Sequence, residues 1–142
     1  MWIDPLELHF LDKIIRSIQV YDLPLYSNMN RSKGLEILAS PCNQFGKQEP
    51  GTADEIKNFC ASKYNVKFPL FSKIDVNGPN THDVYKFLRV NSDMFDHSKK
   101  VAKPIQWNFH IFLVGDDGNV AKSYPPSHEL GAVEEDLKKI FG

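Results

Sequence analysis

Apolar residues recur along this chain at two spacings, one typical of amphipathic helices and the other of short strands. The first such pattern predicts a helix over residues 5–20. The β-branched residues of segment 14–20 leave a short buried strand open as an alternative. Residues 25–32 form either a helix or an irregular approach, and Gly34 is expected to end it before a strand over residues 35–39.

The middle of the chain begins with a helix signal. Thr52 followed by Glu55 has the spacing of a capping box, and the apolar positions after it predict a helix over residues 53–63. A strand is expected over residues 71–76, closed by the turn Asn77-Gly78-Pro79-Asn80. The remaining expected elements are a helix around residues 84–88, a polar loop over 91–104, strands over 109–114 and 120–124 joined by a hairpin turn at 116–119, and a helix that begins near 127–131. This order predicts an α/β layered domain.

Composition narrows the class of protein. A chain of 142 residues with 42% hydrophobic content has the size of one domain and can bury a core. A net charge of -1 argues against nucleic acid or an anionic membrane surface as a primary partner, and no apolar stretch is long enough for stable membrane insertion. Two cysteines suit a reducing compartment, so we expect a cytoplasmic protein. The five histidines are scattered, so we expect no metal site.

Candidate chemistry gathers in two segments. The run Pro41–Thr52 is polar and glycine-rich and directly follows the expected strand at 35–39, where loops often carry functional residues. Together with Trp107-Asn108-Phe109, this run closely resembles the glutathione peroxidase family. Further family motifs lie between these two segments, in the order that the family has them: Glu55-Ile56-Lys57, Phe68-Pro69-Leu70-Phe71, Ile74-Asp75-Val76-Asn77-Gly78 and Tyr85-Lys86-Phe87-Leu88.

The resemblance covers about residues 25–141 and leaves residues 1–24 divergent. It implies one glutathione-peroxidase-like domain over residues 1–142 with a thioredoxin-like α/β fold. In that fold a central mixed sheet is flanked by helices, and the N-terminal part is here expected to be truncated or rebuilt.

The family's catalytic tetrad is a cysteine or selenocysteine, a glutamine, a tryptophan and an asparagine. The resemblance implies that Gln48, Trp107 and Asn108 are three of these, acting as hydrogen-bond donors around a reactive sulfur. The alternative is that Trp107 is a core aromatic and that the two amides are turn residues. The family's nucleophile would fall near residues 11–15, which read Leu-Asp-Lys-Ile-Ile.

Two cysteines are the remaining candidates for redox chemistry. Cys42 is either a relocated nucleophile or a structural or auxiliary residue. Cys60 lies on the helix that bears the resolving cysteine in thioredoxin-dependent members, but one place earlier than their pattern, which favours a buried packing role. A disulfide between the two depends on a Cα separation that the sequence does not provide.

The resemblance implies reduction of hydrogen peroxide or of organic and lipid hydroperoxides as part of an oxidative stress response, with glutathione or thioredoxin as the reducing substrate and no other cofactor. The alternative, because the nucleophile is missing, is a redox-inactive pseudoenzyme with a binding or regulatory role. Lys99, Lys100 and Lys103 either attract carboxylates of the reductant or form a solvated loop. His110 is expected to pack or lie at the surface. The short segment between Leu88 and Trp107 resembles the monomeric, thioredoxin-using or phospholipid-hydroperoxide branch of the family, and self-association through an exposed sheet edge is the alternative to a monomer.

Overall fold

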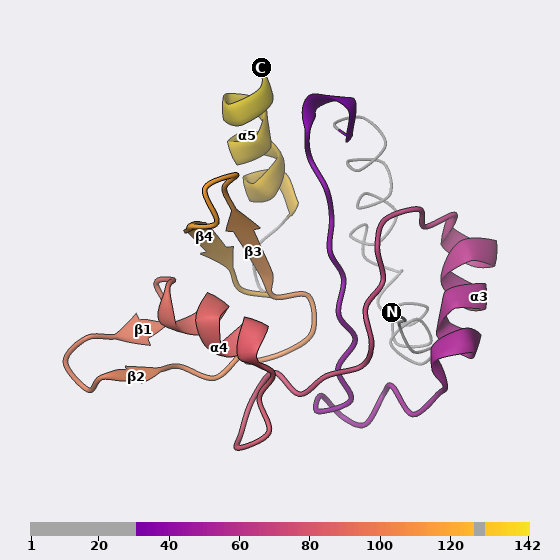
Figure 1. Ribbon diagram of the computed structural model, residues 1–142, viewed down its shortest axis with the longest axis horizontal. Coiled ribbons are helices and arrows are strands. Elements are labelled where there is room, and N and C mark those ends of the chain that lie inside the picture. Colours follow the sequence, from indigo (N-terminus) through magenta and orange to yellow (C-terminus); the bar gives the residue numbers. More distant parts are fainter. Residues whose placement is uncertain (1–30, 127–129) are drawn as a thin grey trace. The chain divides into compact units, whose positions relative to one another are not determined.

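In the computed structural model, residues 31–126 and 130–142 are described. The helix predicted over residues 5–20 and the segment 11–15 lie outside them. The chain divides into two compact units: the first takes in the described residues up to Ile74 and Glu135–Gly142, and the second is Asp75–Glu134. The elements in chain order are η1 (Arg31–Lys33), α3 (Ala53–Tyr64), α4 (Asp83–Val90), β1 (Phe95–Asp96), β2 (Val101–Ala102), β3 (Ile111–Val114), β4 (Val120–Tyr124) and α5 (Leu130–Phe141) (Figure 1).

The segment expected as a strand over residues 35–39 follows η1 as an extended chain. Gly34 ends η1 with a positive φ of 102°, as expected of a glycine at a helix end. Within residues 35–39, the described structure has an isolated parallel bridge, between Ala39 and Leu70, in place of the expected strand. Proline explains why no longer ladder forms, since Pro41 and Pro69 have no N–H to donate.

The strand predicted over residues 71–76 is reduced in the same way. Its main chain runs beside the first segment through two hydrogen bonds, from the Phe71 N–H to the Ala39 oxygen at 2.8 Å and from the Ile74 N–H to the Pro41 oxygen at 3.0 Å. In place of the predicted central mixed sheet, the described residues hold this bridge and two two-stranded sheets, β1-β2 and β3-β4.

Helix α3 confirms the prediction for residues 53–63. The Thr52 N–H donates to Glu55 Oε2 at 2.8 Å, and Thr52 Oγ1 accepts from the Glu55 N–H at 3.5 Å, so both halves of the capping box are present. Ile56, Cys60 and Tyr64 recur every four residues and form the buried face of the helix.

Helix α4 and the hairpin after it belong to the second unit. The predicted turn at residues 77–80 is present, and His82 caps α4 by accepting a hydrogen bond from the Val84 N–H. The polar loop predicted over residues 91–104 instead contains β1 and β2, which pair antiparallel beside α4 (Figure 1). Two-residue strands are too short to leave a detectable alternation of apolar and polar residues.

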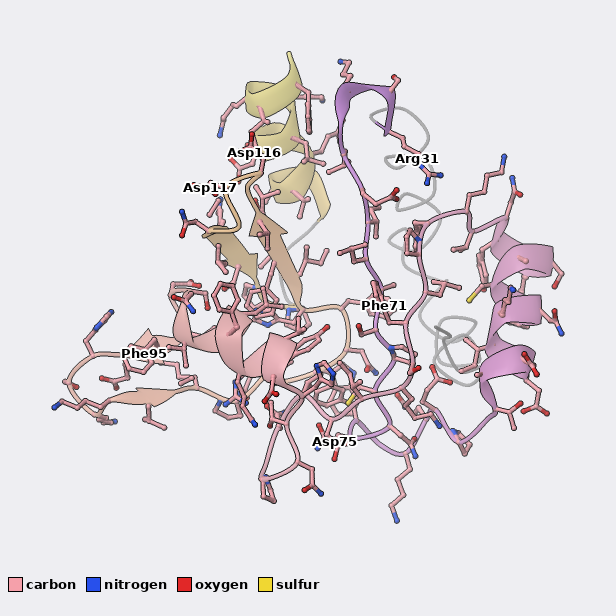
Figure 2. All side chains as sticks on the ribbon, viewed as in Figure 1. Arg31, Phe71, Asp75, Phe95, Asp116 and Asp117 are labelled. Carbon is pink, nitrogen blue, oxygen red and sulfur yellow. The ribbon has the colours of Figure 1, made fainter. Side chains whose placement is uncertain are left out.

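The hairpin of β3 and β4 confirms the second pair of predicted strands. Figure 2 shows Asp116 and Asp117 at its turn. Asp117 Oδ1 accepts a hydrogen bond from the Asn119 N–H at 2.9 Å, which closes the turn. Val133 and Leu137 of α5 are buried as its apolar spacing predicts, but Ile140 is 58% exposed. Of the helices within the described residues, none has the length and apolar character that a membrane crossing requires.

Candidate functional site

The loop that carries Gln48 follows the bridge at Ala39 and is shaped by left-handed backbone. Gly46 has φ 69° and Lys47 has φ 50°. A Cβ added at Gly46 would lie 3.3 Å from the Cγ and Cδ atoms of Gln48. A glycine there permits both the positive φ and the close approach of the main chain to the glutamine.

Two side chains hold the main chain on the C-terminal side of Gln48. Asn43 Oδ1 accepts a hydrogen bond from the Glu49 N–H at 2.8 Å. Lys73 Nζ donates to the Glu49 oxygen at 2.6 Å and to the Gly51 oxygen at 3.2 Å. The role of Lys73 could not be predicted from the sequence, because its acceptors lie 24 and 22 positions away and no motif marks a contact at that range.

Both cysteines are buried thiols of the first unit, Cys42 at 5% and Cys60 at 3% exposure. The Cys42 thiol donates to Gln44 Oε1 at 3.4 Å and its sulfur accepts from the N–H of the same residue at 3.5 Å. Cys60 lies on the buried face of α3, which is the position expected of a packing residue. Reactive thiols are usually partly exposed, whereas both of these are buried. A redox role for either cysteine therefore stays a prediction.

Trp107 and Asn108 belong to the second unit and lie just before β3. Asn108 is buried at 4% exposure, whereas Trp107 is 41% exposed. Phe109 has a positive φ of 62°, so the chain turns there and β3 begins at Ile111 instead of at the predicted Phe109. Gln48 belongs to the first unit, and the structure therefore describes the three expected donors in two separate groups.

Two side chains hold the segment before Trp107 in a way that was not predicted from the sequence. Asn77, expected as a turn residue and as part of a family motif, makes two hydrogen bonds with the main chain of Ile105. The guanidinium of Arg89 donates to three main-chain oxygens, those of Val76, Ala102 and Lys103. Burial lowers the pKa of Arg89. An arginine between two apolar residues of a short helix was the available signal, because a guanidinium must find acceptors for its donors.

His110 packs at the start of the β3 segment. Its ring centroid lies 4.8 Å from that of Phe112. Burial lowers the pKa of His110, and the nearby Asp93 carboxylate offsets part of that effect. Within the described part of the chain, neither ring nitrogen has a hydrogen-bond partner. These contacts agree with the packing role expected for this histidine.

Three lysines at the β1-β2 hairpin are exposed: Lys99 and Lys100 in its turn, and Lys103 directly after β2. Lys99 forms an ion pair with Asp96 at 3.8 Å. Exposed lysines fit both alternatives, attraction of a carboxylate and simple solvation. Across residues 31–126 and 130–142, no group of three or more His, Cys, Asp or Glu side chains is placed to hold a metal ion.

Comparisons with known proteins identify what the chain resembles. The family model described as glutathione peroxidase matches residues 18–89. A phospholipid hydroperoxide glutathione peroxidase of Pisum sativum is 47% identical over 82% of this chain and 47% of its own, so the chain spans about half the length of that relative. A hydroperoxy fatty acid reductase of Synechocystis is 43% identical over 87% of this chain and 73% of its own.

A solved structure supports the fold. The crystal structure of T. cruzi GPX1 matches with a TM-score of 0.60 and 28% identity, over 87% of this chain and 71% of that chain. The predicted thioredoxin-like α/β fold class is thereby confirmed. The predicted cytoplasmic location is wrong by the same comparisons, because the Pisum sativum relative and two relatives from Arabidopsis thaliana are named as chloroplastic proteins.

Proposed function

Because this chain belongs to the glutathione peroxidase family, we propose that it takes part in thiol-dependent reduction of hydrogen peroxide or of organic and lipid hydroperoxides. Two relatives are named for phospholipid hydroperoxides and hydroperoxy fatty acids, which favours a lipid-derived substrate. The observation that carries the proposal is the constrained loop of Gln48, where a left-handed turn and Lys73 fix the main chain on both sides of the amide.

The reaction needs a thiolate and a set of neutral donors. The thiolate sulfur attacks one peroxide oxygen, the O–O bond breaks, and the departing oxygen takes up a proton and leaves as water or an alcohol. The sulfur is oxidised to a sulfenic acid, and two thiol groups of the reductant return it to the thiol, forming a disulfide and releasing the sulfenic oxygen as water. Gln48, Trp107 and Asn108 would donate hydrogen bonds to the thiolate and to the departing oxygen, which stabilises the charge that develops on both.

The residue that supplies the nucleophilic thiol is the part of this mechanism that most needs a test. Cys42 shares its loop with Gln48, and Cys60 lies on the next helix. Both are buried, so either would have to become accessible before a peroxide could reach it. Loss of turnover on substitution of one of them would identify it as the nucleophile.

The finer features of this function are also proposals. Glutathione or thioredoxin supplies the electrons, and the protein acts as a monomer with a single domain over residues 1–142 in the response to oxidative stress. The chloroplastic relatives favour a plastid location. The names of the relatives give no support to a redox-inactive pseudoenzyme.

The test is an assay of NADPH consumption with cumene hydroperoxide or hydrogen peroxide, coupled to glutathione and its reductase or to thioredoxin and its reductase. Gln48→Ala should lower kcat about 10²-fold, the effect of losing one preorganised donor. Gln106→Ala is the matched control, because Gln106 is an exposed glutamine whose side-chain amide donates a hydrogen bond to the main-chain oxygen of Pro104. Cys42→Ser and Cys60→Ser are assayed in parallel.

Equal turnover of the parent and Gln48→Ala would refute the role of the glutamine. No turnover with either reductant, in a sample whose circular dichroism shows a folded protein, would refute the proposed activity for this chain. A loss of turnover confined to Cys42→Ser or to Cys60→Ser would support both the activity and a relocated nucleophile.

A further inference from the structure

The segment from Ala102 to Ile105, which leads to Trp107, is held largely by side chains from other parts of the second unit. Arg89 lies in the last turn of α4, and α4 lies beside β2 (Figure 1). Its Nη2 donates to the Ala102 oxygen and its Nε to the Lys103 oxygen, both at 3.0 Å. The two bonds fasten consecutive carbonyl groups to one rigid, planar group.

Asn77 fastens the same segment two residues before the tryptophan. Asn77 Nδ2 donates to the Ile105 oxygen at 2.8 Å, and Asn77 Oδ1 accepts from the Ile105 N–H at 2.9 Å. The side-chain amide thus pairs with Ile105 as a neighbouring strand would, and satisfies the donor and the acceptor of a residue that is only 4% exposed.

The two side chains are joined to each other. Arg89 Nη1 donates at 3.0 Å to the oxygen of Val76, the residue directly before Asn77. Contacts therefore run from Arg89 through Val76 and Asn77 to Ile105. From Ile105 the chain leads back to Lys103 and Ala102, whose oxygens accept hydrogen bonds from Arg89. We call this set the Asn77–Arg89 clamp. A closed set of bonds leaves the main chain before Trp107 little freedom to rotate.

We propose that Asn77 and Arg89 are positioning residues that set the place of the Trp107 indole and the Asn108 amide by holding the main chain before them. As a contribution to catalysis, this rests on the proposed function, in which those two groups are donors. Neither clamp residue contacts a substrate in the proposal. Each acts through Ile105 and the segment that continues to Trp107.

The experiment reads the position of Trp107 without requiring turnover. Trp2→Phe leaves Trp107 as the sole tryptophan, so acrylamide quenching of its fluorescence reports the exposure of that indole in the folded protein. In this background we compare Asn77→Leu with Asn80→Leu. Asn77→Leu removes both hydrogen bonds of the side-chain amide while keeping a side chain of similar size, and Asn80 is an exposed asparagine of the same turn. We also compare Arg89→Met with Arg89→Lys and with Lys86→Met, an exposed control on the same helix.

We expect the quenching constant to rise in Asn77→Leu and Arg89→Met and to stay at the parent value in both controls. The upper limit is about 2.4-fold, the ratio of a fully exposed indole to its present 41% exposure. Arg89→Lys should give an intermediate value, because one ammonium group cannot reach three carbonyl oxygens with the geometry of a guanidinium.

Parent-like quenching in folded Asn77→Leu and Arg89→Met would overturn the proposal, even if both proteins melt at lower temperature, because loss of stability alone is what a structural role predicts. If those variants do not fold, Asn77→Asp and Arg89→Lys decide it by the same criterion, since each keeps part of the clamp. If the chain proves active, kcat should fall in the clamp variants while KM is retained. If it proves inactive, the quenching result still supports or overturns the clamp by itself.

Discussion

Replacement of His110 by phenylalanine should stabilise this protein, although most single substitutions destabilise. The neutral ring carries one N–H donor and one acceptor nitrogen. Neither nitrogen has a hydrogen-bond partner within the described residues, and both atoms are buried. The native protein therefore bears the cost of removing both from water, and phenylalanine keeps the ring contact with Phe112 while removing that cost.

The magnitude follows from the same contacts. An unsatisfied buried polar group costs about 1–3 kcal/mol. Because the His110 side chain as a whole is only half-buried, and a larger ring costs some packing, we take the lower end, about 1–2 kcal/mol in total. For a chain of this size each kcal/mol moves the thermal midpoint by about 2–4 °C, so we expect His110→Phe to melt about 2–8 °C higher at pH 7.5.

The pH dependence provides a second measurement. Burial lowers the pKa of His110 below its usual 6.5, with a smaller opposing effect from Asp93, which accepts a hydrogen bond from Ser123. The unfolded chain therefore takes up a proton first as the pH falls. The parent should lose stability from about pH 6.5 downward until the folded pKa is reached, and this histidine should contribute no change above that range.

Calorimetry at pH 7.5 and 5.5 on the parent, His110→Phe and His110→Gln separates the two effects. Both variants should lose the His110 part of the acid destabilisation, because neither side chain titrates. Only His110→Phe should be more stable at pH 7.5, since glutamine again buries a polar group. A midpoint for His110→Phe at or below the parent's at pH 7.5 would refute the reasoning.

Two further predictions concern the loop of Gln48 and the helix that follows it. Lys73→Met removes a charged donor from two carbonyl oxygens and should lower the free energy of unfolding by about 1–2 kcal/mol in urea titrations. Lys73→Arg should recover most of this loss, and an unchanged free energy of unfolding in Lys73→Met would count against the role of Lys73. The hydrogen bond from the Thr52 main chain chiefly lowers the pKa of Glu55 from 4.5, so its stabilisation is present above that value and is lost as the pH falls through the lowered pKa. Glu55→Gln should flatten this part of the stability profile from about pH 4.5 downward, and a profile identical to the parent's would contradict it.

Residues of the candidate site that belong to a motif could be predicted from the sequence, whereas residues that bind distant main-chain groups could not. The motif match selected Gln48, Trp107 and Asn108 as candidates, and the structure describes where each lies in its own unit. Lys73 and Arg89 were missed because their partners are main-chain oxygens, which every residue offers and no motif can mark.

Features that depend on neighbours along the chain could be predicted from the sequence alone. The capping box of α3, the apolar spacing that predicts α4, and the turn at residues 116–119 all involve residues within one turn of each other, so local spacing was enough. Two features could be learned only from the folded protein: how far the segment at residues 35–39 pairs, and the pairing of Asn77 with Ile105 across 28 positions. Such contacts depend on where the folded chain brings distant main-chain groups together, and local spacing carries no record of that position.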